Sequence, residues 1–187
     1  MKQLTKLMMT KQTVFNIEEL TSYLQIPTSA GLKSFLQRAK QSKALLNPIK
    51  GIWTFPIYDP FEFSCKLNSD AYISCETVLF REGIFFQFYG NTVSSVTFKS
   101  RSYDIDGRHF IYYRIQPKIA QNLIGIRDYD CYRMATPERA LCDYIYLHPK
   151  ASIDAPELIN QRRIEKLYPF YPKKTVLRIK QLLNAQL

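Results

Sequence analysis

The first 54 residues change from helical to strand periodicity within short segments, which limits the folds open to this part of the chain. Residues 16–24 place apolar side chains on one helical face, and a Gln-Ile-Pro step ends that helix. Residues 29–41 repeat apolar side chains at i, i+3, i+4 and i+7. Residues 44–54 predict two short strands around a turn at Lys50 and Gly51. The order is therefore helix, turn, helix and β-hairpin.

Capping residues support both helices of this segment. Asn16 followed by Glu19 matches a capping box, in which each side chain binds the backbone of the other residue. Thr28 or Ser29 is suited to cap the second helix. Residues 4–10 could supply a third helix. Together these elements predict a winged helix-turn-helix.

Prolines between residues 56 and 60 mark the expected boundary between two domains. We expect residues 1–58 to form the winged helix-turn-helix, and residues 59–187 to form a mixed α/β C-terminal domain. The overall fold class is therefore α+β.

Strand signals dominate the first half of the second domain. Ser74 is suited to cap a short helix predicted over residues 75–82. Residues 85–115 predict a series of strands with turns at Gly90-Asn91 and Asp106-Gly107. More strand is expected near residues 123–135, and a closing basic helix near the C-terminus. The cationic side of that last helix is either a polyanion contact, a surface for an acidic partner, or a plain solvated face.

Positive charge is concentrated at the two ends of the chain, whose formal net charge is +10. Residues 1–50 hold eight basic and two acidic residues, and residues 161–187 hold seven basic and one acidic residue. Residues 51–160 hold eleven basic and thirteen acidic residues. A basic end favours a polyanionic partner, most often nucleic acid.

The polar face of the second predicted helix carries donor-rich side chains and no carboxylate. Such side chains bind DNA phosphates and base edges, so we expect double-stranded DNA to be the partner. Trp53 is expected to fill the core between the hairpin and the helices. The predicted DNA-binding residues are Ser29, Lys33, Ser34, Gln37, Lys40, Gln41 and Lys50.

Charged residues in "ATPERALCDYIYLHP", residues 135–149, raise the question of a catalytic cluster. Thr136 matches a helix N-cap, and the Glu two residues later suits the positive end of the helix dipole. Arg139 and Asp143 are spaced i, i+4 and can form an ion pair. Each charge thus has a structural role, and we expect no catalytic residue here.

Metal and cofactor sites are not indicated. The four cysteines form no zinc-binding spacing and are expected to be free thiols in a reducing cytoplasm. The N-terminus lacks the apolar core of a signal peptide, and no apolar run is long enough to cross a bilayer. We expect a cytoplasmic protein that holds no cofactor and no metal.

Three motifs resemble those of the AbiEi-type antitoxins of type IV toxin–antitoxin systems, which act in abortive infection. The resemblance covers residues 13–150. Its motifs are the hairpin end "GIW" at Gly51, Ile52 and Trp53, the helix start "YIS" with Leu79 and Gly83, and "ATPERA" with Asp143. The last motif is the most specific.

The resemblance implies a two-part regulator. Its N-terminal winged helix would bind the operator of its own operon and repress it. Its C-terminal domain, residues 59–187, would oppose a partner toxin, which in this family is a nucleotidyltransferase.

Two other functions stay open at this point. Asp104 and Asp106 form a D-x-D pair, an arrangement that binds metal ions in nucleotidyltransferases and nucleases, although a hairpin turn explains Asp106-Gly107 better. Alternatively, the chain is a protein-interaction module without specific DNA binding. The enzyme alternative predicts a metal-dependent reaction on nucleic acid, and the interaction module predicts a stable protein complex without salt-dependent DNA affinity.

Overall fold

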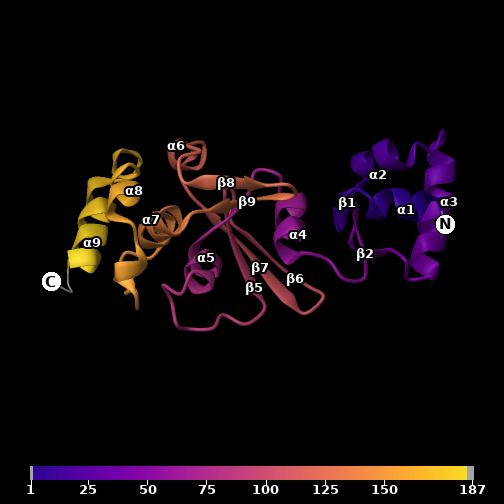
Figure 1. The fold of residues 1–187 in the computed structure, drawn as a ribbon. Coiled ribbons are helices and arrows are strands. Elements are labelled where there is room, and N and C mark those ends of the chain that lie inside the picture. The colour runs from indigo at the N-terminus through magenta and orange to yellow at the C-terminus, as the bar shows by residue number, and fades with distance from the viewer. Residues whose placement is uncertain (1, 185–187) are drawn as a thin grey trace. The chain divides into compact units, whose positions relative to one another are not determined.

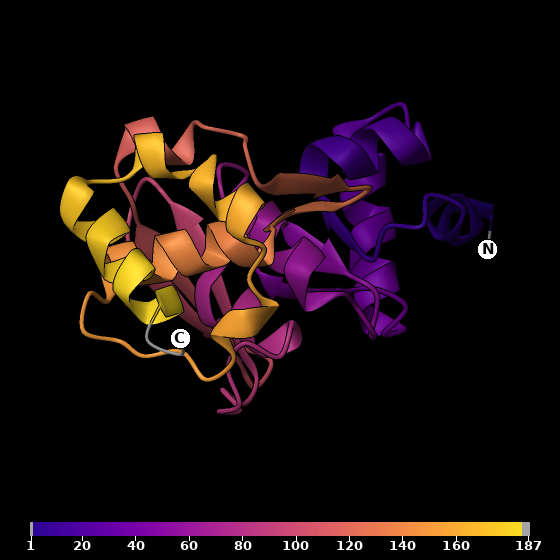
Figure 2. The ribbon, with the colours of Figure 1, turned by 60° about the vertical axis from the view of Figure 1, so that its left-hand side comes forward.

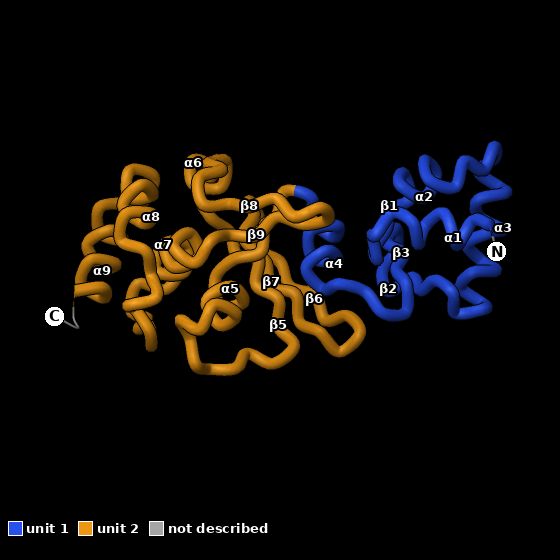
Figure 3. The backbone as a smooth tube through the Cα atoms, viewed as in Figure 1, with its two compact units in different colours: residues 1–69 blue, residues 70–187 orange. Residues whose placement is uncertain are grey.

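A computed structural model describes residues 2–184, and the chain has a mixed α+β fold with two β-sheets. This confirms the predicted fold class at that level. The chain divides into two compact units, residues 1–69 and residues 70–187 (Figure 3). Within the described residues, no helix has both the length and the apolar character needed to cross a membrane.

Unit 1 consists of helices around a small antiparallel sheet with strand order β1-β3-β2. Pro48 lies in an edge strand, where its missing N–H costs no ladder hydrogen bond. The elements are α1 (Lys2–Met8), β1 (Val14–Asn16), α2 (Ile17–Leu24), α3 (Ser29–Gln41), β2 (Leu46–Ile49), β3 (Ile52–Thr54) and α4 (Pro60–Leu67).

The core of unit 1 is built from the apolar faces that the periodicity predicts. α1 contributes the fully buried Leu7, which places it in the core as the third helix. Trp53 is half-buried and packs against this core. The buried core residues are Leu7, Phe15, Leu20, Leu24, Leu32, Leu36, Ala39 and Leu45.

Both predicted helix starts are present. The Asn16 side chain accepts a hydrogen bond from the Glu19 backbone N–H at 2.9 Å, and Glu19 Oε2 accepts from the Asn16 N–H at 3.0 Å. This reciprocal pair is the predicted capping box. For α3 the N-cap is Thr28, whose hydroxyl oxygen accepts from the Gly31 N–H, whereas Ser29 is the first helical residue.

The boundary between the units differs from the predicted one at residues 58/59. α4 follows that point in the chain but packs against β1 in unit 1. Glu62 on α4 accepts hydrogen bonds from the backbone N–H and the hydroxyl of Thr13, at 2.8 and 2.6 Å. Lys66 on the same helix forms an ion pair with Glu19. These tertiary bonds join α4 to the first unit, so the proline-rich segment is a connection within that unit.

Unit 2 is built on a sheet with strand order β6-β7-β5-β4-β9-β8, in which the β5–β7 and β4–β9 pairs are parallel. Its strands are β4 (Tyr72–Ile73), β5 (Thr92–Thr97), β6 (Arg101–Ile105), β7 (Arg108–Arg114), β8 (Ile126–Tyr129) and β9 (Tyr132–Ala135). Its helices are α5 (Cys75–Arg81), α6 (Pro117–Ala120), α7 (Pro137–Leu147), η1 (Pro156–Leu158), α8 (Gln161–Glu165), η2 (Tyr168–Phe170) and α9 (Lys173–Asn184).

The helices of unit 2 pack in succession from the sheet outward. α5 packs on β5 and against α7, and α7 in turn contacts α8 and α9. Figures 1 and 2 show α7 between the sheet and this C-terminal pair. The closing basic helix predicted near the C-terminus is α9, which buries Ile179 and leaves Lys173, Lys174 and Lys180 exposed.

One strand expectation in unit 2 is confirmed and another is wrong. Asp106 and Gly107 both have positive φ, at 51° and 71°, as the two-residue turn of the β6–β7 hairpin requires. Residues 85–89, predicted as strand, form an irregular segment before β5. Its backbone is bound by Asp154 instead, whose carboxylate accepts from the Phe86 N–H at 2.8 Å. A strand there has no neighbouring strand to pair with.

The buried Glu62 makes the stability of unit 1 depend on pH. Burial raises the pKa of Glu62 above its ordinary value of 4.5, against the opposing effect of the Thr13 hydrogen bonds. Its contribution to stability is therefore present below that ordinary value and is lost as pH rises through the folded-state pKa. We expect the free energy of unfolding of the wild type, relative to Glu62→Gln, to fall in urea titrations as pH rises above the ordinary pKa of 4.5.

The matched control for this experiment is Glu18→Gln, because Glu18 is exposed in the first turn of α2. Its stability difference from wild type should not show the same trend. A wild-type advantage over Glu62→Gln that stays constant or grows with pH would contradict the role of burial.

Candidate nucleic-acid interface

Helix α3 presents the polar face on which the DNA-binding prediction rests. The helix contains no Asp or Glu. Lys33, Gln37 and Lys40 follow one another at i, i+4 and i+7, so they lie along one stripe of the helix. All six predicted residues of α3 are exposed: Ser29, Lys33, Ser34, Gln37, Lys40 and Gln41.

A pocket of about 910 Å³ lies beside this stripe, entirely within unit 1. Its polar lining includes Lys33, Gln37 and Lys40, and its apolar lining includes Leu32, Leu36 and Trp53. The lining contains no carboxylate among the described residues. The pocket therefore combines an apolar floor with cationic and amide donors on its rim.

A glycine in the first turn of α3 lies close to the turn between α2 and α3. Residues 25–28 separate the two helices, and Gln25 adopts the left-handed conformation with φ of 51°. A Cβ at Gly31 would lie 2.9 Å from the Ile26 side chain and 3.0 Å from the Thr28 hydroxyl oxygen. Gly31 thus permits the close approach of the Ile26 and Thr28 side chains to α3, and a larger residue would require these side chains to shift.

Lys50 lies at the tip of the β2–β3 hairpin and is exposed. Gly51 beside it has a φ of 88°, which suits a tight turn. The Asn47 side chain donates hydrogen bonds to the carbonyls of Ile49 and Ile52, at 2.8 and 2.6 Å, and so holds the two strands together. The hairpin is short and well supported, as the sequence predicts.

The structure brings four of the seven predicted residues together and places three elsewhere. Ser29, Lys33, Gln37 and Lys40 line the pocket. The other three do not line it: Ser34, Gln41 and Lys50. The sequence prediction omitted Arg38, an exposed cation on α3, and the apolar pocket residues, whose shared cavity depends on tertiary packing.

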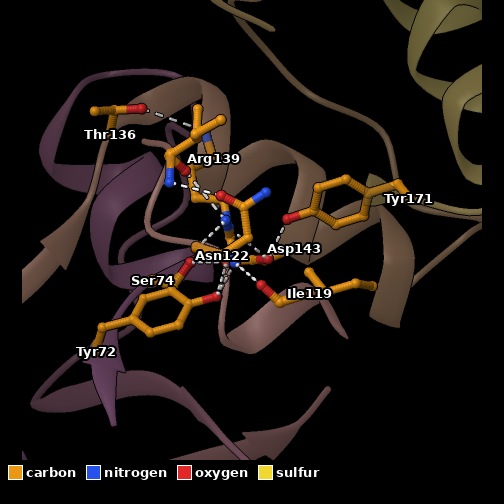
Figure 4. A network of polar contacts seen from close by, with 9 residues as sticks. Tyr72, Ser74, Ile119, Asn122, Thr136, Arg139, Asp143 and Tyr171 are labelled. Carbon is orange, nitrogen blue, oxygen red and sulfur yellow. Dashed lines mark hydrogen bonds and ion pairs between the residues drawn. The ribbon is translucent and has the colours of Figure 1, made fainter. Parts of the chain in front are cut away.

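Two of the charged residues of the motif at residues 135–149, Arg139 and Asp143, form a buried network in unit 2 (Figure 4). Asp143 and Arg139 are both fully buried, and Arg139 Nε donates to Asp143 Oδ1 at 3.2 Å. Tyr171 donates its hydroxyl to the same oxygen at 2.5 Å. Tyr72 and Ser74 donate to Asp143 Oδ2 at 2.9 and 2.8 Å. Because the Arg139 Nε–H is shared with Oδ2 at 3.4 Å, Oδ1 accepts two hydrogen bonds and Oδ2 accepts three.

The guanidinium of Arg139 is equally well satisfied. Nε donates to Asp143, and Nη2 donates to the Tyr72 hydroxyl at 2.9 Å. Burial alone would lower the pKa of Arg139, but the Asp143 carboxylate raises it above its ordinary value. The remaining donors bind backbone carbonyls of Ile119, Asn122 and Ile124 at 2.7, 3.0 and 3.1 Å.

The complete hydrogen bonding of Arg139 and Asp143 gives these two charged residues of the motif a structural role. A guanidinium offers five N–H donors, and all five are used within the protein. Ser74, expected to cap α5 with its side chain, forms no cap hydrogen bond and binds Asp143 instead. The predicted Arg139–Asp143 pair is confirmed, and its complete burial is what the sequence prediction missed.

A second polar cluster, at the start of α5, was also missed from sequence. Glu76 is buried, and its Oε1 accepts from the Tyr113 hydroxyl at 2.9 Å. Oε2 has no hydrogen-bond partner among the described residues, and His148 Nε2 lies 3.9 Å from Oε1. Burial raises the pKa of Tyr113, so its hydroxyl keeps its proton and can donate to Glu76.

The D-x-D pair lies at the β6–β7 hairpin. Asp104 Oδ1 lies 2.6 Å from His109 Nδ1, and Asp106 occupies the turn. Within residues 2–184, no group of three or more His, Cys, Asp or Glu side chains is arranged to hold a metal ion. The four cysteines are free, and burial raises the pKa of the Cys75 and Cys142 thiols well above the ordinary value.

Comparison with known proteins gives a similarity of fold. The sequence matches no family model and no curated protein. Among solved structures, the chain is similar to the crystal structure of the RV2827C protein from Mycobacterium tuberculosis, with a TM-score of 0.59 and 14% sequence identity. The match covers 97% of this chain and 75% of that chain. At this identity the likeness concerns the mixed α+β fold alone.

Removing one partner of the buried ion pair should destabilise the protein strongly. In Asp143→Ala the Arg139 charge remains buried without its counter-ion, so we expect a loss of about 3–5 kcal/mol in urea unfolding. Tyr171→Phe removes one hydrogen bond to the charged carboxylate and should cost about 1.5–3 kcal/mol.

Asp128→Ala is the control, because Asp128 is an exposed acid on β8 and its loss should cost no more than about 0.5 kcal/mol. Similar, small losses in Asp143→Ala and Asp128→Ala would show that the network does not stabilise the fold.

Proposed function

We propose that residues 1–58 act as a winged helix-turn-helix that binds double-stranded DNA, and that the chain represses its own operon as the antitoxin of a type IV toxin–antitoxin system. The observation that carries the DNA-binding half is the exposed, acid-free face of α3. Lys33, Gln37 and Lys40 form one stripe, which suits a helix that enters the major groove.

The local architecture of unit 1 supports this assignment. α2 and α3 are joined by a four-residue turn, residues 25–28, and the β2–β3 hairpin follows α3 directly. In winged helix-turn-helix proteins the second helix reads the groove and the hairpin contacts the backbone. Lys50 at the hairpin tip is placed for a phosphate contact.

The antitoxin half follows from the AbiEi resemblance and is supported by an exposed aromatic surface in unit 2. Phe86 and Phe88 are 72% and 69% exposed, and the Phe80 ring lies 5.6 Å from that of Phe88. Exposed aromatic side chains of this kind are typical of protein-contact surfaces. The proposed partner is a nucleotidyltransferase toxin.

Removing lysines from α3 should weaken DNA binding in a salt-dependent way. A variant that makes one phosphate contact fewer should have a slope of log K against log salt that is shallower by about one unit. For Lys33→Ala and Lys40→Ala we therefore expect roughly fivefold weaker binding to the upstream promoter near 0.15 M salt. Fluorescence anisotropy across a salt series measures both quantities, with scrambled DNA as the reference.

Lys6→Ala is the matched control, because Lys6 is an exposed lysine on α1. It should leave the affinity and slope near those of the wild type. If all three variants lose affinity equally, or if the promoter is not preferred over scrambled DNA, the binding depends on net charge alone and the operator assignment fails.

The antitoxin role predicts a separate effect in unit 2. When the chain is co-expressed with a nucleotidyltransferase encoded beside it, we expect growth to be restored. Phe86→Ser combined with Phe88→Ser should reduce this protection and leave promoter binding unchanged. The control Leu177→Ser replaces an apolar side chain that is 60% exposed on α9 and should keep full protection. If the double variant still protects fully, the aromatic surface is not needed for the antitoxin activity.

A further inference from the structure

A small pocket in unit 2 is lined by three cations from different parts of the chain. Its volume is about 220 Å³. Arg127 lies on β8 and Arg163 on α8, and Lys166 directly follows α8. The rest of the lining is Ile124, Gly125, Thr136 and Leu167.

The positive charge of this pocket is not compensated by the protein. Arg127, Arg163 and Lys166 are exposed, and none of them forms an ion pair with a carboxylate of residues 2–184. Glu165, the acidic residue of α8, lines a different pocket, and its carboxylate accepts a hydrogen bond from Gln161 at 3.4 Å. Three like charges around one cavity favour an anion of more than one charge.

Rigid backbone forms the wall beside these cations. The Thr136 N–H donates to the Gly125 carbonyl at 2.7 Å, and Arg139 holds the carbonyl of Ile124 at 3.1 Å. Gly125 has a φ of 76°, and a Cβ there would lie 2.9 Å from the Cβ of Arg139. The buried network therefore fixes the loop that lines the pocket.

Thr136 can add a neutral donor to the charged ones. Its hydroxyl oxygen accepts a hydrogen bond from the Arg139 N–H at 3.4 Å, as the N-cap of α7. The hydroxyl proton remains able to donate to a ligand in the pocket. The residues that line the cavity thus include two arginines, one lysine and one threonine, whose side chains can bind an anion.

We infer that this pocket binds the phosphate group of a small phosphorylated molecule, such as a phosphate monoester or a diphosphate. Guanidinium groups bind phosphate oxygens in a bidentate manner, and a lysine adds a point charge. The volume is smaller than the roughly 300–1,000 Å³ of sites that enclose a drug-sized ligand. It suits a head group, with the remainder of the molecule in solvent. This site does not depend on DNA binding by unit 1.

Titration calorimetry of the full-length chain with pyrophosphate and with inorganic phosphate, at constant ionic strength, tests the site. We expect saturable binding by the wild type, and a loss of affinity of about tenfold or more in Arg163→Ala and in Lys166→Ala. Arg163→Lys keeps the charge but not the bidentate geometry and should give an intermediate affinity.

Arg162→Ala is the matched control, because Arg162 is an exposed arginine on the same helix that does not line the pocket. It should change the affinity by less than about twofold, as a surface substitution outside the site. Equal losses in Arg162→Ala and Arg163→Ala would overturn the proposal, since net charge would then explain the binding. Failure of the wild type to bind either anion would also overturn it.

A duplex DNA fragment distinguishes the two sources of phosphate. If Arg163→Ala weakens DNA binding and the wild type does not bind pyrophosphate, the pocket is a DNA-backbone contact and the small-molecule assignment is wrong. If pyrophosphate binding is lost in Arg163→Ala and promoter binding is kept, the assignment holds whether or not α3 reads an operator.

Discussion

The ion pair between Arg139 and Asp143 is the interaction on which unit 2 depends. Both partners lie on α7, and they bind three segments that are distant in sequence: β4, residues 119–124 and Tyr171. Two buried charges are costly unless every donor and acceptor is satisfied. Here the donors of Arg139 and the carboxylate oxygens of Asp143 are all satisfied by the protein, so the network favours one arrangement of these segments.

The same network borders the pocket that we propose to bind a phosphate group. The loop that Arg139 holds from inside lines the pocket of Arg127, Arg163 and Lys166 on the outside. The buried charges are neutralised within the fold, whereas the exposed cations of this pocket are not. Part of the excess positive charge of the chain is thus concentrated at this pocket.

In unit 1 the buried Glu62 joins α4 to Thr13 and is not a member of the hydrophobic core cluster. The core of unit 1 is apolar, and the caps at Asn16 and Thr28 satisfy the helix starts locally. Packing of Leu32, Leu36 and Ala39 inward leaves the opposite face of α3 to donors alone. The two units therefore present separate cationic surfaces, one proposed to bind DNA and one proposed to bind a small phosphorylated molecule.

Local signals in the sequence determined the helices and turns. The caps, the Lys50-Gly51 and Asp106-Gly107 turns and the apolar face of α3 depend on neighbours a few residues apart, and the sequence predicts them. Tertiary structure alone decided the rest. Residues 85–89 lack a partner strand, α4 joins unit 1 through Glu62, and Arg139 is buried because carbonyls about 15–20 residues away meet it. Spacing along the chain cannot reveal such partners, since they depend on which distant segments pack together.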